Sequence, residues 1–118
     1  MAPGDEALIE TAFVRFLEAE GWTVHRQVGG HDFEATRGSE ILRAEVKGRT
    51  GANTGLDLDT IYGQLLRRME DDDATYAVVV PKESGMAVRR VSKRVRDLLR
   101  IAVFKVDLET GNVIREDR

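Results

Sequence analysis

Two short segments in which polar and apolar residues alternate meet at a Gly-Ser pair, and this pattern constrains the fold more than any other feature of the chain. The segments cover residues 31–37 and 40–47, and Gly38 and Ser39 separate them. A two-residue link that begins with glycine is typical of a type II′ turn, because glycine readily adopts the positive φ of the first central position. The sequence therefore predicts an antiparallel β-hairpin.

A two-residue turn also predicts which residues of the hairpin face each other. Counting outward from the turn, Asp32 is opposite Glu45, and closer to the turn Glu34 is opposite Arg43. Opposed side chains share one face, with Cβ atoms about 4.5–5.5 Å apart. Alternation then separates an apolar face, suited to the core, from a charged face that we expect to lie off the core. The apolar face consists of His31, Phe33, Ala35, Leu42, Ala44 and Val46. The charged face consists of Asp32, Glu34, Thr36, Ile41, Arg43, Glu45 and Lys47.

The charged face places the carboxylates of Asp32 and Glu45 in direct opposition. Opposed carboxylates repel each other unless a positive charge lies between them. Mg²⁺ is a natural candidate, because it prefers oxygen ligands and is often held by one or two carboxylates and a phosphate. The Val46 carbonyl could add a ligand, and Lys47, roughly 6–7 Å further along this face, could activate a water or neutralise a phosphate. The alternative is an ordinary charged outer face with cross-strand pairs such as Glu34 with Arg43.

Helix and strand patterns alternate along the rest of the chain. Apolar residues at helical spacing predict helices over residues 5–20, 59–70 and 86–99. Alternating or continuous apolar segments predict further strands over 22–27, 75–80 and 101–106, and residues 113–115 could add a short final strand. The Gly-rich segment 48–57 is typical of a mobile loop. The order α-β-β-β-α-β-α-β indicates an α/β fold in the broad sense. We expect a mixed central sheet, as in α+β proteins, with helices on its flanks.

Composition limits the range of functions. The 118 residues suffice for one domain, residues 1–118, and 42% of them are hydrophobic, as in a globular protein. No apolar segment approaches the length of a membrane span, and we expect no signal peptide. The absence of cysteine fits a cytoplasmic protein and removes Cys-based zinc sites. With only two histidines, a His-rich metal site is not expected.

A basic segment offers a candidate surface for nucleic acid, although the net charge of −3 counts against such a partner. Along the predicted helix 86–99, four basic residues recur on one side and form a stripe suited to phosphates. They are Arg89, Lys93, Arg96 and Arg100. Arg67 and Arg68 could extend this stripe, or could simply extend their charged ends to solvent over an apolar surface. A solvated helix face is the equal alternative.

With these motifs the sequence resembles the PD-(D/E)XK nuclease superfamily, which has the restriction-endonuclease-like fold, and most closely the small archaeal-type Holliday-junction resolvases. The matching stretches are ETAFVRFLEAEGWTVHRQ and HDFEATRGSEILRAEVKG, and the resemblance covers residues 5 to about 81. It implies that Asp32 and Glu45 bind the metal and that Lys47 is catalytic. It also implies an acidic residue from the first helix, best matched by Glu10 with Glu6 as second choice, and a glutamine on the later helix, matched by Gln64. The proline of the family motif is absent, because His31 occupies its position.

The resemblance implies an endonuclease that uses Mg²⁺, or Mn²⁺ in its place, to hydrolyse phosphodiester bonds in DNA, possibly branched or junction DNA. It also implies a homodimer, and some members work only with a helicase or specificity partner. A different class of function stays open: a catalytically silent module of the same fold that binds nucleic acid or a protein partner. Metal binding and cleavage by the isolated protein separate these alternatives.

Overall fold

The computed structural model describes residues 5–26, 33–48, 54–71, 73–84 and 87–116. The helices are α1 (Asp5–Ala19), α2 (Thr54–Arg67) and α3 (Lys93–Leu98), and two short 3₁₀ helices are η1 (Lys82–Ser84) and η2 (Ala87–Arg90). The strands are β1 (Thr23–Arg26), β2 (Phe33–Arg37), β3 (Glu40–Val46), β4 (Ala74–Pro81), β5 (Ile101–Val106) and β6 (Val113–Glu116). No helix among the described residues is long and apolar enough to cross a membrane.

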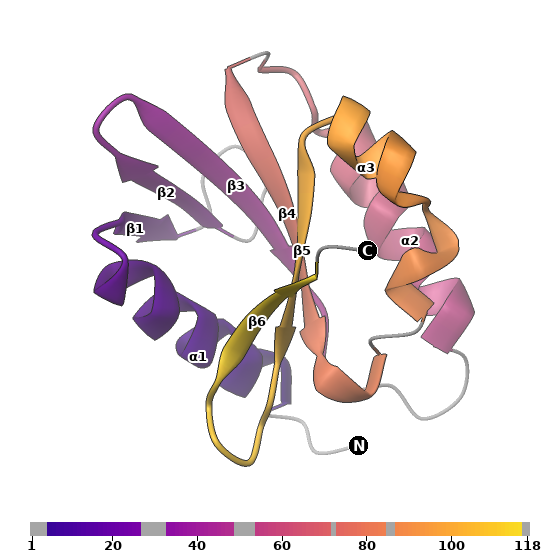
Figure 1. The fold of residues 1–118 in the computed structure, drawn as a ribbon, viewed down its shortest axis with the longest axis horizontal. Helices are drawn as coiled ribbons and strands as arrows, with labels where there is room; N and C mark the ends of the chain where they lie inside the picture. The colour runs from indigo at the N-terminus through magenta and orange to yellow at the C-terminus, as the bar shows by residue number, and fades with distance from the viewer. Residues whose placement is uncertain (1–4, 27–32, 49–53, 72, 85–86, 117–118) are drawn as a thin grey trace.

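The six strands form one mixed sheet in the order β1-β2-β3-β4-β5-β6. The central pairs β3–β4 and β4–β5 are parallel, whereas the outer pairs are antiparallel. Helix α1 covers one face of the sheet, and α2 and α3 lie together on the other side (Figure 1). The predicted mixed sheet flanked by helices is therefore confirmed.

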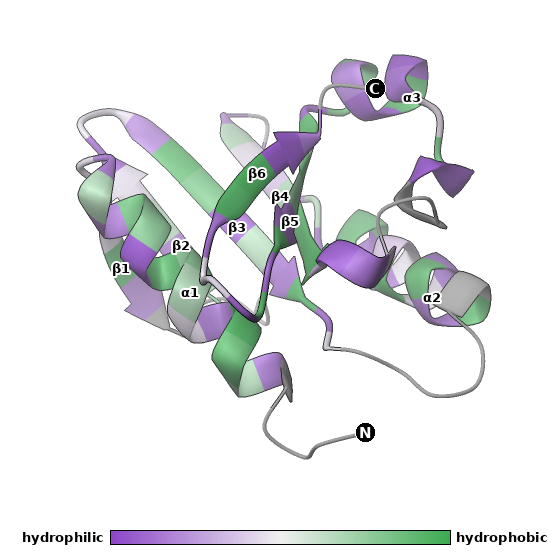
Figure 2. Ribbon diagram, turned by 60° about the horizontal axis from the view of Figure 1, so that its bottom comes forward, coloured by the Kyte–Doolittle hydropathy of each residue, from purple (hydrophilic) through white to green (hydrophobic). Residues whose placement is uncertain are grey.

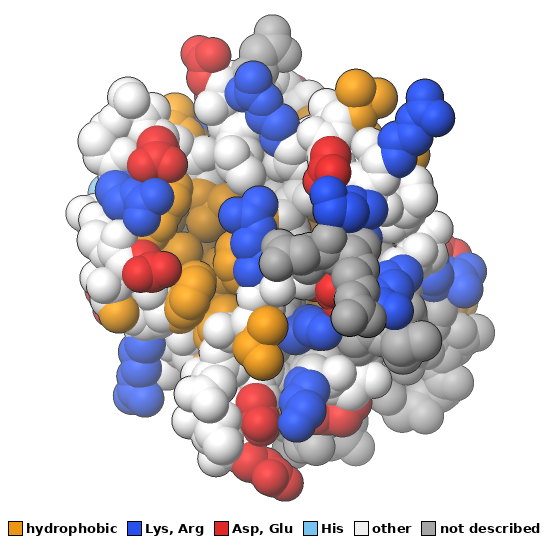
Figure 3. Space-filling view, in the orientation of Figure 1, with side chains coloured by type: hydrophobic (Ala, Val, Ile, Leu, Met, Phe, Trp, Pro, Cys, Tyr) orange, Lys and Arg blue, Asp and Glu red, His pale blue; other side chains and the backbone are white. Residues whose placement is uncertain are grey.

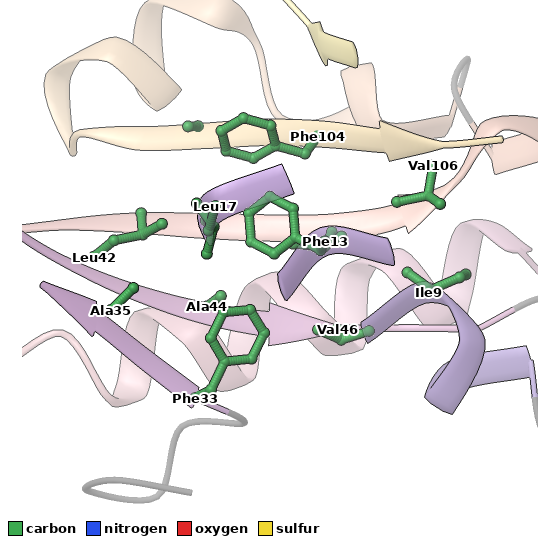
Figure 4. Close-up of a cluster of buried hydrophobic side chains, with 13 residues drawn as sticks. Ile9, Phe13, Leu17, Phe33, Ala35, Leu42, Ala44, Val46, Phe104 and Val106 are labelled. Atoms are coloured by element: carbon green, nitrogen blue, oxygen red, sulfur yellow. The ribbon is translucent and has the colours of Figure 1, made fainter. Parts of the chain in front are cut away.

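Each face of the sheet carries its own apolar cluster. In the cluster under α1, the ring centroids of Phe13 and Phe104 lie 4.8 Å apart, and those of Phe13 and Phe33 lie 5.6 Å apart (Figure 4). The second cluster lies between α2 and the sheet, and α2 contributes Tyr62 to it. Burial raises the pKa of the Tyr62 hydroxyl to about 12. Hydrophobic and hydrophilic residues alternate along α1 and α2, as expected for helices that cover a sheet with one side (Figure 2).

The hairpin has the predicted register. Phe33 pairs with Ala44, and Glu34 pairs with Arg43. Gly38 has a φ of 59°, and Ser39 does not share this positive φ, as a type II′ turn requires. The predicted apolar face is also confirmed from Phe33 to Val46, because its described members are all buried in the cluster under α1. His31 and Asp32 lie outside the described residues.

The structure corrects the predicted helices in the second half of the chain. Helix α2 begins at Thr54, so it includes part of the predicted loop. Residues 86–99 do not form one helix: η2 and α3 replace it, and the Ser92 hydroxyl accepts a hydrogen bond from the Val95 amide at the start of α3. Serine competes with the helix for backbone hydrogen bonds and therefore favours this capping position. The apolar spacing of the predicted helices suggests that Val95, Leu98 and Leu66 are buried, but all three are exposed.

Candidate functional site

Of the two opposed acids of the hairpin, Glu45 is the one that the structure describes. It lies near the end of β3, where it pairs with Val78 of β4, and only 2% of its surface is exposed. Its neighbours Ala44 and Val46 belong to the cluster under α1. Alternation therefore turns Glu45 toward the α2 side of the sheet. The expectation that this carboxylate lies off the core is wrong, because α2 covers the charged face of the hairpin at this end.

A cation from α2 compensates the buried charge. Nη1 of Arg68, the residue directly after α2, donates a hydrogen bond to Oε1 of Glu45 and forms an ion pair with it. A carboxylate removed from water is costly unless it is paired and hydrogen-bonded. Arg68 was predicted to extend a phosphate-binding surface, and its pairing with Glu45 was not predicted. Only the burial of Glu45 could have indicated that this carboxylate needs a cationic partner. That burial depends on where α2 packs, which the sequence does not give.

Lys47 is the residue directly after β3. Its amide donates a 2.9 Å hydrogen bond to the carbonyl of Val79, so the parallel ladder extends one position beyond Val46. The side chain is half-buried. Strand alternation predicts that Lys47 shares the Glu45 side of the sheet, and this stays a prediction. The Val46 side chain is buried on the opposite side, and a metal-binding role for its carbonyl stays a prediction.

The two predicted helix residues lie on helices that cover opposite faces of the sheet (Figure 1). Gln64 is half-buried on α2, four residues before Arg68. Glu10 is half-buried on α1 and follows Ile9, which lies beside Val46 (Figure 4). Glu10 could therefore approach Glu45 only around the end of β3. Within the described residues, no group of three His, Asp or Glu side chains is placed to hold a metal ion.

A second charged cluster on the hairpin is structural. Nε of Arg43 donates a 3.0 Å hydrogen bond to Oε2 of Glu34, and Nη2 lies 3.4 Å from Oδ2 of Asp71. Burial alone would lower the pKa of Arg43, but the hydrogen bond and the charges of Glu34 and Asp71 raise it. This confirms the predicted Glu34–Arg43 pair and attaches the hairpin to the segment before β4.

The predicted basic stripe does not form as one surface. Arg96 is 3% exposed, and its Nε donates a 3.0 Å hydrogen bond to the carbonyl of Val91. Arg89 lies 3.6 Å from Glu116, and Lys93 is paired with Asp97. The stripe assumed a continuous helix, which Ser92 interrupts. Of the four predicted residues, Arg89, Lys93 and Arg100 stay at the surface.

A hollow with an apolar floor and a charged rim opens on the face shown in Figure 3. It has a volume of about 370 Å³, and Phe16, Trp22, Leu42 and Phe104 are among the residues that line it. Leu42 and Phe104 belong to the cluster under α1, so this hollow opens on the opposite side of the sheet from Glu45. None of the predicted site residues is among the described residues that line it.

Solved structures share this fold, and two of them align with almost the whole chain. One is an XisH family protein from Nostoc punctiforme, with 18% identity and a TM-score of 0.63 over 93% of this chain and 95% of that one. The other is an fdxN element excision controlling factor protein from Anabaena variabilis, with 17% identity and a TM-score of 0.66 over 92% and 96%. Neither a protein-family model nor a curated protein matches the chain. At these identities the similarity concerns the fold, which is shared over almost the whole length of both neighbours.

Proposed function

We propose that this chain is a metal-dependent endonuclease with a restriction-endonuclease-like core, and that its active site lies at the end of β3. The element order α1-β1-β2-β3-α2-β4 is the order that the resemblance implies. One neighbour in fold is named as a factor that controls excision of the fdxN element. A role in DNA processing for this chain agrees with that name.

The hairpin register is the observation that carries this proposal. The pairing from Arg37–Glu40 to Phe33–Ala44 follows the predicted register without a bulge. One further step in this register would bring Asp32 opposite Glu45, whose carboxylate is buried at the end of the sheet. Lys47 then follows on the same side of β3. Asp32 would supply the second carboxylate of the proposed site, and it lies outside the described residues.

The available oxygen ligands suit a small hard cation. Glu45 together with Asp32 would supply one or two carboxylate ligands, and Mg²⁺ commonly takes its remaining ligands from water and phosphate. A bound Mg²⁺ would lower the pKa of a water molecule and stabilise negative charge on a phosphate. Arg68 holds the Glu45 carboxylate, so metal binding requires the two cations to share Glu45 or Arg68 to release it.

The remaining residues of the proposed site would act on the substrate. The ammonium group of Lys47 would orient the attacking water or compensate charge on the phosphate. Gln64, one turn from Arg68, would contact the substrate from α2, and Glu10 would contribute from α1 a water-mediated or second-metal contact. We propose DNA as the substrate, possibly branched DNA, with Arg89, Lys93 and Arg100 as surface contacts to phosphates.

Cleavage assays on matched variants test the proposal. The full chain is incubated with fluorescently labelled linear, flap and four-way junction DNA in the presence of Mg²⁺, Mn²⁺ or Ca²⁺. We expect cleavage with Mg²⁺ or Mn²⁺. Asp32→Asn and Glu45→Gln should lower the rate by about 10²-fold or more. Glu34→Gln is the control, because it removes a carboxylate from the same face of the hairpin.

Thermal unfolding of each variant, followed by circular dichroism, separates a loss of chemistry from a loss of fold. If Glu45→Gln is folded and cleaves DNA as fast as the parent, the assignment of Glu45 is wrong. If all metals and substrates leave the DNA intact, a specificity partner or helicase must be supplied before the nuclease proposal is abandoned.

A silent binding module is the second candidate, and the ion pair between Arg68 and Glu45 favours it. Arg68 neutralises the buried acid without a metal, so Glu45 could serve stability alone. Isothermal titration with Mn²⁺ separates the two candidates. A nuclease site should bind Mn²⁺ in the parent and lose binding in Asp32→Asn, whereas a silent module should bind no Mn²⁺ but can still shift a DNA probe.

A further inference from the structure

Three arginines from separate elements line one hollow where β4 and β5 begin. The hollow has a volume of about 250 Å³. Its arginines are Arg96 of α3, Arg100 of the turn after α3, and Arg115 of β6. Among the described residues that line it, Asp97 is the one acid, and its carboxylate is already paired with the ammonium group of Lys93. This cationic hollow therefore carries an excess of positive charge.

Arg100 has a backbone conformation that is unfavourable for an arginine. Its φ is 58°, in the left-handed region that favours glycine at the end of a helix. Its amide donates a 3.2 Å hydrogen bond to the carbonyl of Asp97, and its carbonyl accepts a 2.9 Å hydrogen bond from the amide of Tyr76. Glycine could form both of these backbone hydrogen bonds without the steric cost. Strain of this kind is common at functional sites, so the side chain of Arg100 points to a role in the cationic hollow.

The apolar hollow of about 370 Å³ described above adjoins the cationic hollow. Thr75, Ala102 and Arg115 line both of them. Arg115 lies at the boundary, because its guanidinium carbon is 5.9 Å from the centre of the Phe104 ring, which belongs to the apolar hollow. A ligand that fills both hollows would therefore meet aromatic surface on one side of Arg115 and further arginines on the other.

The acidic residues of the apolar hollow lie at its other end. Glu40 begins β3, three strands away from β6, and Glu20 follows α1. Arg37 donates hydrogen bonds to the carboxylate of Glu40 and to the carbonyl of Glu20, and its guanidinium carbon lies 4.5 Å from the centre of the Trp22 ring. That end therefore has no excess of positive charge. Arg115, in contrast, forms no ion pair with any described residue.

We propose that the two hollows together bind a small aromatic phosphate monoester, a compound of the nucleoside monophosphate class. Its ring would stack in the apolar hollow, where Phe16, Trp22 and Phe104 offer aromatic surface. Its phosphate would lie in the cationic hollow, because a monoester carries close to two negative charges near neutral pH and accepts hydrogen bonds from several guanidinium groups.

This site lies apart from the proposed nuclease site. β3, β4 and β5 run parallel, and the cationic hollow lies where β4 and β5 begin, whereas Glu45 lies near the end of β3. The two proposals share only Arg100, so the failure of one leaves the other standing.

Fluorescence titration of the full chain tests the proposal. Trp22 is the single tryptophan and lines the apolar hollow, so its emission reports a ring that stacks there. The probes are adenosine monophosphate, adenosine and inorganic phosphate, and isothermal titration measures each affinity independently. We expect adenosine monophosphate to change the emission of Trp22 and to bind at least about 10-fold more tightly than adenosine or phosphate, because it alone fills both hollows.

Two arginine variants and a matched control test the cationic end. Arg115→Gln should weaken binding of adenosine monophosphate by about 10-fold or more, as expected for the loss of a charge-assisted hydrogen bond. Arg100→Gly should weaken it similarly, yet its Tm should equal or exceed that of the parent, because glycine adopts the positive φ without strain. Arg94→Gln should bind like the parent, because Arg94 is an exposed arginine of α3 that lines neither hollow.

Four results would each overturn the proposal. The first is a folded parent that does not bind adenosine monophosphate, and the second is binding no tighter than that of adenosine or of phosphate. The third is binding that leaves the emission of Trp22 unchanged. The fourth is an Arg94→Gln variant that loses as much affinity as Arg115→Gln, since the effect would then reflect overall charge and not the cationic hollow.

Discussion

The guanidinium of Arg68 is paired with the carboxylate of Glu45, an acid that is only 2% exposed and lies between the sheet and α2. The pair joins the residue after α2 to the end of β3. It therefore stabilises the packing of α2 on the sheet, and it occupies the carboxylate that the proposed metal site needs. If the pair serves only packing, no metal should restore the stability that is lost when Arg68 is removed. If Glu45 belongs to a metal site, a divalent cation should restore it.

Arg68→Ala should destabilise the protein and make its stability depend on metal. Removing one partner leaves the Glu45 charge buried, at a cost of roughly 1–3 kcal/mol, because Arg68 itself is about a third exposed. If a cation can replace the guanidinium, Mn²⁺ or Mg²⁺ should recover much of the lost stability through binding to the folded state. Thermal unfolding of parent and variant across a metal titration measures both effects.

Arg67→Ala is the control for this prediction, because Arg67 is the exposed neighbour at the end of α2. It should change neither the stability nor the metal response appreciably. In the double variant Glu45→Gln, Arg68→Ala, the buried charge is gone and the metal response should disappear. If Arg68→Ala loses stability and no divalent metal restores it, the pair is structural and the metal site is contradicted.

Lys47→Met should separate metal binding from catalysis. In the proposed site Lys47 acts on water or phosphate and does not hold the metal, so the variant should still bind Mn²⁺. Its cleavage rate should fall by about 10²–10⁴-fold, the range typical of a lost proton-transfer or charge-stabilising group. Single-turnover cleavage and isothermal titration measure the two quantities. Lys82→Met, at an exposed lysine after β4, should leave both unchanged. Unimpaired cleavage by Lys47→Met would remove Lys47 from the mechanism.

The hairpin register is predictable from sequence because its causes are local. Gly38 determines the turn type, the turn determines the pairing, and alternation assigns Phe33 and Val46 to the core. The strand over Ile101–Val106 is likewise found at its predicted bounds, because a short apolar segment with β-branched residues indicates a buried strand. These inferences need no knowledge of how distant elements pack.

The contacts that complete the site depend on distant elements and are not predictable in this way. Arg68 and Glu45 are separated by 23 residues and meet only because α2 packs across the sheet. Helical periodicity marks Leu66 and Leu98 as apolar, but it cannot show whether another layer covers them. The break before α3 had a visible signal in Ser92, a favoured capping residue that the spacing of valines and leucines obscured.

Phe13→Ala should strongly destabilise the protein without affecting the chemistry of the folded state. Phe13 is fully buried, and its ring contacts those of Phe16, Phe33 and Phe104. Truncation leaves a cavity in the cluster under α1, which typically costs about 3–5 kcal/mol. Urea unfolding measures the loss. Phe16→Ala should cost clearly less, because Phe16 is only partly buried, and equal losses would contradict the described packing.

Asp59→Asn should reduce stability at neutral pH but not in acid. Nε and Nη2 of Arg90 each donate a 2.8 Å hydrogen bond to the Asp59 carboxylate, which joins η2 to α2. These hydrogen bonds, together with the charge of Arg90, lower the pKa of Asp59. A lowered pKa in the folded state stabilises the protein above the ordinary carboxyl pKa of about 3.9, and this contribution disappears as pH falls through the folded-state value. The Tm difference between parent and variant should therefore be a few degrees at most near pH 7, since the pair is exposed, and should vanish in strong acid. Arg90→Gln should show the same pH dependence, and adding it to Asp59→Asn should cost little more. A difference that persists unchanged into strong acid would show that Asp59 stabilises the protein by some means other than its charge.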